Sequence, residues 1–426
     1  MKKFLALIIA LVMALSLVAC GEQKQPDNPD VPDDGQQTAT VKVGFITLHD
    51  ENSTYDLNFI NAAKEAIANL GLTDADYILK TNVPEGQECY ETAMNLVDEG
   101  CNIIFADSFG HEPYMIDAAK EHPEVQFCHS TGTRAHTEKL ANYHNAFASI
   151  YEGRYLAGIA AGLKLNEMIE AGKFTADEAK MGYVGAFTYA EVVSGYTSFF
   201  LGARSVCPTV TMDVTFTGSW YDETLEKEGA EKLIQGGCKL ISQHADSLGA
   251  PTACENAGVP NVSYNGSTKD ACPNTFIVSS RIDWAPYYEM CIKAVMDGTE
   301  IPADWTGTLA TGSVVLTDVN ETAAAAGTAE AIAAATEKLE KGEIHVFDCA
   351  NFTTKVDDKV NTFKADYLKL DETGHITSYM ADVDTDAAYT GDTEVIKDGY
   401  FAESEFRSAP YFDLQIDGIN LLDTAM

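Results

Sequence analysis

Short apolar runs recur along the chain, and each is followed by a polar turn and a stretch with helical periodicity. Clear cases are VKVGFI (42–47) before LNFINAAKEAIANLG, NIIFA (102–106) before EPYMIDAAKEH, and KMGYVGA (180–186) before VVSGYTSFFLGAR. Comparable apolar runs lie at 125–129, 209–216, 239–244 and 259–265. Because strands buried on both faces lack polar alternation, this pattern predicts parallel sheets covered by helices. The units are too numerous for one ordinary sheet, so we predict an α/β fold with two doubly wound parallel-sheet lobes.

The amino end has the features of a lipoprotein signal peptide, predicted to comprise residues 1–19. Lys2 and Lys3 precede an apolar stretch that is too short for a comfortable bilayer span. The stretch closes with Leu-Val-Ala-Cys, the pattern in which Cys20 receives a lipid after cleavage; an ordinary secretory signal is the alternative. Residues 20–40 hold three prolines and five acidic residues, which predicts a disordered acidic linker. We therefore expect a body anchored by lipid on the extracytoplasmic face of the cell membrane.

The charge balance excludes several partners. The chain has 28 Lys and Arg residues against 65 Asp and Glu residues, a net charge of -37, and cleavage of the leader makes it -39. Such a surface repels nucleic-acid phosphates and anionic lipid headgroups, so no nucleic acid is expected as a partner. A phosphorylated ligand is disfavoured for the same reason.

Ligands of doubly wound sheets bind beyond the carboxyl ends of the strands, so the segments after the apolar runs are the candidate site. Several aromatic residues there suit a flat aromatic ligand: Tyr55, Phe109, Phe187, Tyr189 and Trp284. Polar residues in the same segments can hydrogen-bond to the edge of a heterocycle: Asp107, His244, Asp246 and Asn265. For any single aromatic ring the alternative is simple coverage of the sheet end, and His244 equally suits an ordinary loop hydrogen bond.

Nine cysteines follow Cys20, an odd number that excludes complete internal pairing. Several lie inside apolar runs and none has zinc-site spacing, so buried free thiols are the default expectation. A disulfide between Cys254 and Cys272 is the alternative.

At these loops the chain resembles the basic membrane protein family of ABC-transporter substrate-binding lipoproteins, which bind purine nucleosides or bases. The resemblance spans about residues 42–350 and is most specific in these segments: YEGRYLAG (151–158), EVVSG (191–195), LGARSV (201–206), SWYD (219–222), QHADS (243–247) and WAPYY (284–288). It implies the type I periplasmic-binding-protein fold, in which a hinge between the lobes closes on ligand. The last two segments resemble the branch of the family associated with a free purine base.

The resemblance also implies roles for individual residues. Tyr55 would stack on one face of the base, with Phe109, Phe187 or Tyr189 on the other. Asp246 and Asn265 occupy positions that hydrogen-bond to the base. Nucleoside binders usually have Asp where this chain has Asn265, and a lysine near Ser280 that supports the ribose. Arg281 is the candidate replacement for that lysine, and an ordinary surface arginine beside Asp283 is the alternative.

Carried over from the family, lobe 1 would comprise residues 41–147 and 279–311, and lobe 2 residues 148–277 and 312–426. The chain would cross back near Ser279 and again near Gly312. Residues 350–426 match the family poorly and are expected to form an acidic, partly β appendage on a lobe. The alanine-rich run Thr322–Lys341 is predicted to be a structural helix that stops at Gly342.

No catalytic, metal or cofactor motif emerges from the sequence. The acidic run at 382–386 resembles the start of a calcium loop, but Ala387 and Thr393 stand where Gly and Glu are needed, which favours a solvated turn. The sequence therefore predicts a monomeric, lipid-anchored binding protein that captures a purine base or nucleoside for an ABC permease, without cofactor or catalysis. The alternatives are an extracellular sensor or adhesin on the same fold and, less favoured, a nucleoside-processing enzyme.

Overall fold

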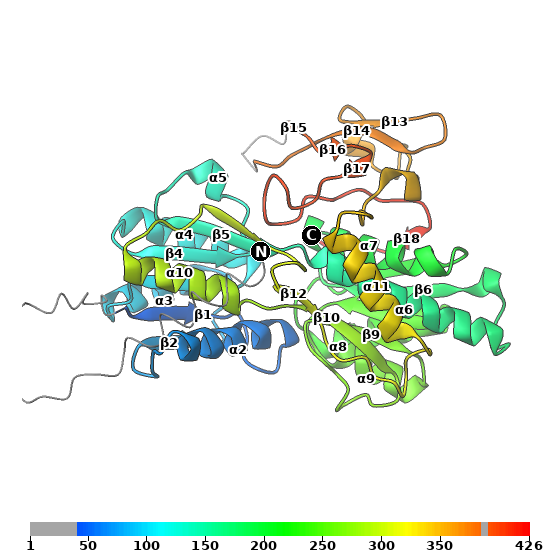
Figure 1. The fold of residues 1–426 in the computed structure, drawn as a ribbon, viewed down its shortest axis with the longest axis horizontal. Helices are drawn as coiled ribbons and strands as arrows, with labels where there is room; N and C mark the ends of the chain where they lie inside the picture. Colours follow the sequence, from blue (N-terminus) through cyan, green and yellow to red (C-terminus); the bar gives the residue numbers. More distant parts are fainter. Residues whose placement is uncertain (1–40, 385–390) are drawn as a thin grey trace, which may run out of the picture. The chain divides into compact units, whose positions relative to one another are not determined.

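The computed structural model describes residues 41–384 and 391–426, so the predicted signal peptide, Cys20 and the linker lie outside the described residues. Residues Ala39–Met426 form one compact unit, built around two separate, mainly parallel sheets (Figure 1). Among the described residues, no helix is long and apolar enough to cross a membrane.

The first sheet has six strands in the order β11-β5-β4-β3-β1-β2, and neighbouring strands are parallel. Its strands are β1 (Val43–Ile46), β2 (Tyr77–Lys80), β3 (Ile103–Ala106), β4 (Gln126–Ser130), β5 (Tyr143–Ala148) and β11 (Asp304–Gly307). Its helices are α2 (Thr54–Asn69), α3 (Gln87–Asp98), α4 (Glu112–Glu121), the short α5 (Ala135–Glu138) and α10 (Ala285–Asp297). Ile103 and Phe105 pack on one face with α2 and α10, whereas Ile104 and Ala106 pack on the other with α3 and α4. Both faces of β3 are therefore apolar, as the continuous run predicted.

The second sheet has seven strands in the order β12-β10-β9-β8-β6-β7-β18. Its strands are β6 (Lys180–Gly185), β7 (Thr211–Phe216), β8 (Leu240–His244), β9 (Asn261–Tyr264), β10 (Phe276–Ile282), β12 (Val314–Leu316) and β18 (Ile419–Leu421). Strand β12 is antiparallel to β10, and the other pairs are parallel. Helices α6 (Ile150–Glu170) and α7 (Ala190–Val206) cover one face, and α8 (Glu223–Gln235) and α9 (Gly249–Ala257) the other; α11 (Thr328–Glu340) packs on α6. The predicted α/β class with two parallel-sheet lobes is confirmed.

The chain passes between the two sheets after Ala148, after Ile282 and after Gly307. The crossing expected near Ser279 therefore comes later, because β10 remains paired with β9 and β12 as far as Ile282. This arrangement joins the two lobes through several short connections, which is the geometry that a hinge requires.

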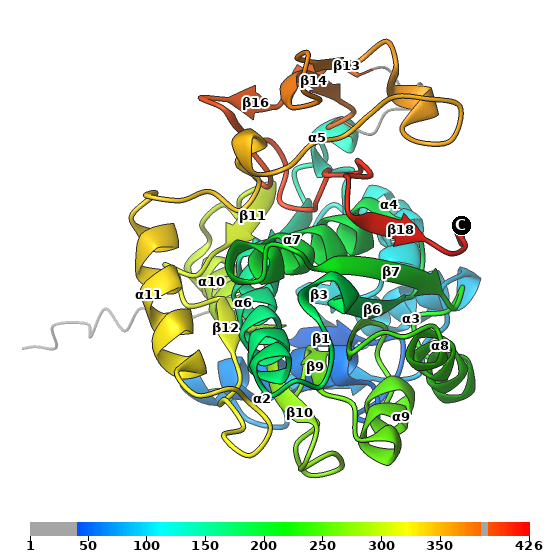
Figure 2. The ribbon, with the colours of Figure 1, turned by 90° about the vertical axis from the view of Figure 1, so that its right-hand side faces the viewer.

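The region after α11 forms small antiparallel sheets and then returns to the second lobe (Figure 2). Its strands are β13 (Leu368–Leu370), β14 (Ile376–Ala381), β15 (Thr393–Glu394), β16 (Ile396–Lys397) and β17 (Tyr400–Phe401). Phe347, Phe401 and Phe412 from this region belong to the same core as α6 and α7. The region also contacts the first lobe, where Ser408 N donates to Asp304 Oδ2 (2.6 Å).

All nine cysteines after Cys20 are buried free thiols. The disulfide considered between Cys254 and Cys272 is absent, and burial raises the pKa of the Cys272 thiol to about 11. The default expectation of buried thiols is therefore the one that the structure shows.

Candidate ligand-binding site

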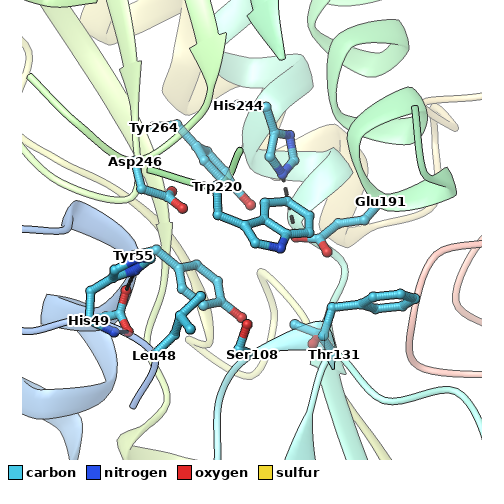
Figure 3. A pocket seen from close by; sticks show the side chains of 12 residues that line it. Leu48, His49, Tyr55, Ser108, Thr131, Glu191, Trp220, His244, Asp246 and Tyr264 are labelled. Carbon is cyan, nitrogen blue, oxygen red and sulfur yellow. Dashed lines mark hydrogen bonds and ion pairs between the residues drawn. The ribbon is translucent and has the colours of Figure 1, made fainter. Parts of the chain in front are cut away.

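A pocket lies between the two lobes, at the carboxyl ends of strands from both sheets (Figure 3). The first lobe lines it with Leu48, His49, Tyr55, Asp56, Ser108, Phe109 and Thr131, and the second with Glu191, Trp220, His244, Asp246 and Tyr264. These atoms surround about 360 Å³ of space, which includes the opening to solvent. The position is the one where doubly wound sheets bind ligands.

The wall from the first lobe is fixed by hydrogen bonds at the start of α2. The Tyr55 hydroxyl donates to the Asp107 carbonyl oxygen (2.7 Å), which sets the direction of the ring. Asp56 accepts from the Ser53 hydroxyl (2.5 Å) and from His49 N (2.7 Å). Burial alone would raise the pKa of Asp56, but these hydrogen bonds and one with the His49 ring lower it below its usual value. Asp56 is therefore a carboxylate in the pocket lining at neutral pH.

The wall from the second lobe centres on His244, at the end of β8. Its Nε2 lies 3.4 Å from Glu191 Oε1 in the first turn of α7, and its ring packs on Tyr264 with 4.2 Å between centroids. Burial, and less strongly the positive charge of Arg154, lower the pKa of His244, although Glu191 opposes them. His244 is therefore a neutral imidazole at neutral pH, able to donate through one ring nitrogen and accept through the other.

Arg154 lies beneath this wall and is fully buried in α6. Its Nη2 donates to Ser242 Oγ (2.7 Å) and its Nη1 to Ser263 O (3.1 Å). The guanidinium carbon lies 5.2 Å from the centre of the Tyr264 ring. The guanidinium thus ties strands β8 and β9 to α6 and supports Tyr264 from behind the pocket.

Aromatic rings from both lobes stack at one side of the pocket. Phe109 of the first lobe stacks on Tyr189 of the second at 5.1 Å, and Tyr189 stacks on Phe187 at 5.1 Å with an interplanar angle of 16°. Phe187 meets Trp220 edge to face at 5.1 Å. We call these four residues the aromatic cluster. It presents ring faces and edges that suit a flat aromatic ligand.

The polar lining is acidic. Burial, followed by the nearby charges of Asp56, Glu226 and Glu191, raises the pKa of Asp246 well above its usual value. The same causes, burial and the Asp56 charge, raise the pKa of Asp107. None of the twelve lining residues is Lys or Arg. The pocket therefore offers carboxyl groups to hydrogen-bond donors of a ligand and no cation to a phosphate.

The structure brings most of the predicted site residues together. Tyr55, Phe109, His244 and Asp246 line the pocket directly. Behind the lining, Asp107 supports Tyr55 through its carbonyl, and Asn265 Nδ2 donates to Asp246 Oδ1 at 3.4 Å. Phe187 and Tyr189 contact the lining through the aromatic cluster.

Trp284 and Arg281 lie elsewhere. Trp284 is 1% exposed and stacks on Phe59 of α2 with 4.6 Å between ring centroids, inside the core of the first lobe. It caps the start of α10, whose apolar side packs into that core, so its position after a strand did not bring it to the pocket. Arg281 is not among the lining residues, and its guanidinium lies 3.8 Å from Asp283, which agrees with the surface alternative. Neither residue therefore lines this pocket.

Several residues that line the pocket were not predicted from the sequence. Leu48, His49, Asp56, Ser108, Glu191 and Trp220 lie within the loop segments recognised after the strands but were not selected from them. Tyr264 is the last residue of β9, and Thr131 follows β4 in the left-handed region (φ 71°). A position at the end of a strand or in the segment that follows it was the available signal for all of them, and aromatic character favoured Trp220 and Tyr264 over their neighbours.

Fold and pocket together define a two-lobed substrate-binding protein, and comparison with known proteins identifies its family. Residues 45–348 match the family model described as "ABC transporter substrate-binding protein PnrA-like" (Bmp). The chain therefore belongs to the Bmp family of ABC transporter substrate-binding proteins.

Curated relatives agree on the family and differ in the ligand that they are named for. A purine-binding protein of Brucella abortus is 32% identical over 61% of this chain and 70% of its own length. TsgA13 of Haloferax volcanii, a protein named for glucose binding, is 33% identical over 48% of this chain and 49% of its own length. The nucleoside-binding protein BmpA of Lactococcus lactis is 23% identical over 63% of this chain and 72% of its own.

Solved structures show the same fold. A solute-binding protein of an ABC transporter system from Aeropyrum pernix superposes with a TM-score of 0.59 at 19% identity, over 75% of this chain and 95% of its own. One from Conexibacter woesei has a TM-score of 0.57 at 19% identity, over 72% of this chain and 98% of its own. In both cases about a quarter of this chain lies outside the superposition.

Proposed function

We propose that this protein is the extracytoplasmic receptor of an ABC importer and captures an uncharged purine base or nucleoside between its lobes. The observation that carries the proposal is the pocket itself, where stacked aromatic rings adjoin carboxyl groups and the lining has no lysine or arginine. A purine offers a flat ring system and N–H donors to such a lining. The relatives named for purine and nucleoside binding support this ligand class.

Individual contacts follow from the same geometry. Tyr55 is proposed to stack on the base, since its hydroxyl is already held by Asp107 and its ring forms part of the lining. Asp246 and His244 are proposed to hydrogen-bond to the edge of the base. Lipid attachment at Cys20, a monomeric state and delivery to a permease complete the proposal. No turnover of the ligand is expected.

The test is isothermal titration of residues 39–426, which form one compact unit, after unfolding and refolding to remove carried-over ligand. The titrants are adenine, guanine, adenosine, guanosine, inosine and glucose. Micromolar or tighter binding of one purine, with a negative heat-capacity change and unaltered ligand by chromatography, would establish the receptor and decide base against nucleoside. No heat with any purine would overturn the ligand class, and heat with glucose alone would replace it by a sugar.

A pair of variants ties binding to the pocket. Tyr55→Ala removes the proposed stacking ring and is expected to weaken purine binding about 2- to 10-fold, since a ring stack contributes roughly 0.5–1.5 kcal/mol beyond burial. Phe363→Ala is the matched control, because that residue is 91% exposed and is not among the residues that line the pocket. Equal purine affinity of the two variants would show that the ligand does not stack on Tyr55.

A further inference from the structure

Residues beyond the family match contact a loop next to the ligand pocket. The match ends at residue 348, whereas strand β18 lies much later in the chain and pairs in parallel with β7 at the edge of the second sheet. We call residues 419–425 the tail segment. After β18, Leu422 N donates to Val214 O (2.8 Å), so the tail segment continues along β7 towards its carboxyl end, where the pocket lies.

Asp423 anchors the tail segment there. Its Oδ1 accepts from Phe216 N (2.7 Å), and its Oδ2 accepts from Thr215 Oγ1 (2.6 Å) and lies 3.1 Å from Lys232 Nζ. Each oxygen therefore has a partner on β7 or α8. The anchor fixes the next residues against the loop that follows β6.

Ala425 makes a two-way contact with that loop. Thr188 N donates to Ala425 O (2.8 Å), and Ala425 N donates to Thr188 Oγ1 (3.0 Å). Thr188 stands between Phe187 and Tyr189, the two residues that link Phe109 to Trp220 in the aromatic cluster. The loop that contains the rings is thus held by the tail segment on one side and leads into α7, with Glu191, on the other.

We infer that the tail segment is a positioning element of the ligand pocket: through Thr188 it holds Phe187 and Tyr189 in the stacked arrangement that closes one side of the site. The inference rests on the proposed function in one respect, that a flat ligand binds against the aromatic cluster. Its structural part, that residues 419–425 order the Thr188 loop, stands independently of the ligand.

Two readouts on residues 39–426 separate these parts. Hydrogen exchange of the amides at 187–190 reports loop order without any ligand, because the Thr188 amide is itself bonded to Ala425. Titration with the tightest purine reports affinity. The variants are a chain ending at Leu422, Thr188→Val, which removes the hydroxyl acceptor at nearly constant shape, and Thr188→Ser, which keeps it. A chain ending at Ala425 is the control, because it lacks only Met426, which is 89% exposed.

The chain ending at Leu422 is expected to exchange the loop amides at least about tenfold faster, with its melting temperature retained by the intact sheet. Thr188→Val is expected to weaken purine binding about 2- to 10-fold, as loss of one hydrogen bond does, and Thr188→Ser to restore it. Unchanged exchange and affinity in both the shortened chain and Thr188→Val would overturn the inference. If the unaltered protein binds no purine, the proposed function fails, and the exchange rates alone then decide whether the tail segment positions the loop.

Discussion

Glu226 is a buried carboxyl next to the pocket loop that begins at Asp246. Ser247 N lies 3.2 and 3.1 Å from its two oxygens, and Asp222 N donates to Oε1 (3.2 Å). Burial raises the pKa of Glu226 to about 7, because these hydrogen bonds only partly offset the loss of hydration. The folded protein therefore binds this proton more tightly than the unfolded chain. The resulting stability is fully present below about pH 4.5 and is lost as pH rises through about 7.

We predict that Glu226→Gln flattens this part of the pH dependence. Glutamine cannot ionise, so the variant should not lose this stability as pH rises. Between pH 4.5 and 8, its free energy of unfolding should therefore rise by about 3 kcal/mol relative to that of the unaltered protein. Urea unfolding at a series of pH values measures the difference. Glu231→Gln, in the same helix and 47% exposed, is the control and should show no such change. If the free energies of unfolding of Glu226→Gln and of the unaltered protein change in parallel with pH, the raised pKa of Glu226 is contradicted.

Single residues also show how far the sequence could predict the site. Tyr55 and Asp246 were predictable because each lies in the segment that follows a strand, where the fold places a ligand. Trp284 follows a strand as well, yet it packs in the core because α10 lies flat on the sheet. Whether a side chain after a strand points to the pocket or to the core depends on how the next helix packs. The local sequence does not determine that packing.

At the scale of elements, helices α6 and α7 lie in very close contact, and glycines make this approach feasible. A Cβ on Gly158 would lie 2.0 Å from Phe199 O, and one on Gly202 would lie 1.9 Å from Tyr155 O. Both neighbours are main-chain atoms, which cannot move aside without displacing a helix. Helix α6, which contains Arg154, is thereby held firmly against α7.

We predict that Gly158→Ala and Gly202→Ala each lower the free energy of unfolding by about 3 kcal/mol, because a methyl group would separate the helices. Chemical denaturation checks the values. Gly229→Ala in α8 is the matched control, since its Cβ would meet only ordinary contacts from 3.4 Å. That control should be neutral or more stable by up to about 1 kcal/mol through helix propensity. Equal effects at the three sites would exclude close packing as the reason for these glycines.

The strands with continuous apolar runs were predictable, and strand β5 shows why others were not. Its sequence YHNAFA places two polar residues inside the strand, so no apolar run is visible. Both side chains form hydrogen bonds in the structure. The His144 ring bonds to Gln126 and Pro302, and Asn145 Oδ1 accepts from Ala135 N (2.6 Å). Buried polar groups of this kind depend on partners distant in the chain, so periodicity alone cannot identify the strand.

At the scale of the whole molecule, two sets of contacts join the lobes, one at the pocket and one away from it. At the pocket, Thr54 N donates to Asp246 O (3.0 Å), and Asn58 Nδ2 lies 3.5 Å from Asn265 Oδ1. Away from the pocket, the region after α11 has most of its core in the second lobe but bonds to the first lobe through Asp304. The family pattern gives no account of this second contact, because it involves residues beyond the family match. Opening of the lobes must break both sets of contacts.

We predict that Asp304→Ala favours the open arrangement of the lobes. The substitution removes the acceptor of Ser408 N and the partner of the His136 ring, at 3.2 Å. Loss of about 1 kcal/mol from the closed form should shift the ratio of open to closed protein about fivefold and quicken ligand release by a similar factor. Small-angle scattering without ligand should show a larger radius of gyration than in the unaltered protein, and saturating ligand should abolish the difference.

Asp297→Ala is the matched control for this prediction, because Asp297 is an exposed residue at the end of α10. It should leave scattering and ligand release unchanged, which separates the loss of a contact between lobes from the loss of one negative charge. The same comparison at higher pH adds an independent check. Hydrogen bonding to Asp304 raises the pKa of His136, so the charged pair is fully formed at low pH and is lost as pH rises through that raised pKa. Because this pair joins α5 to β11 within the first lobe, ligand release should not follow its titration, which distinguishes the contact between the lobes from this ion pair.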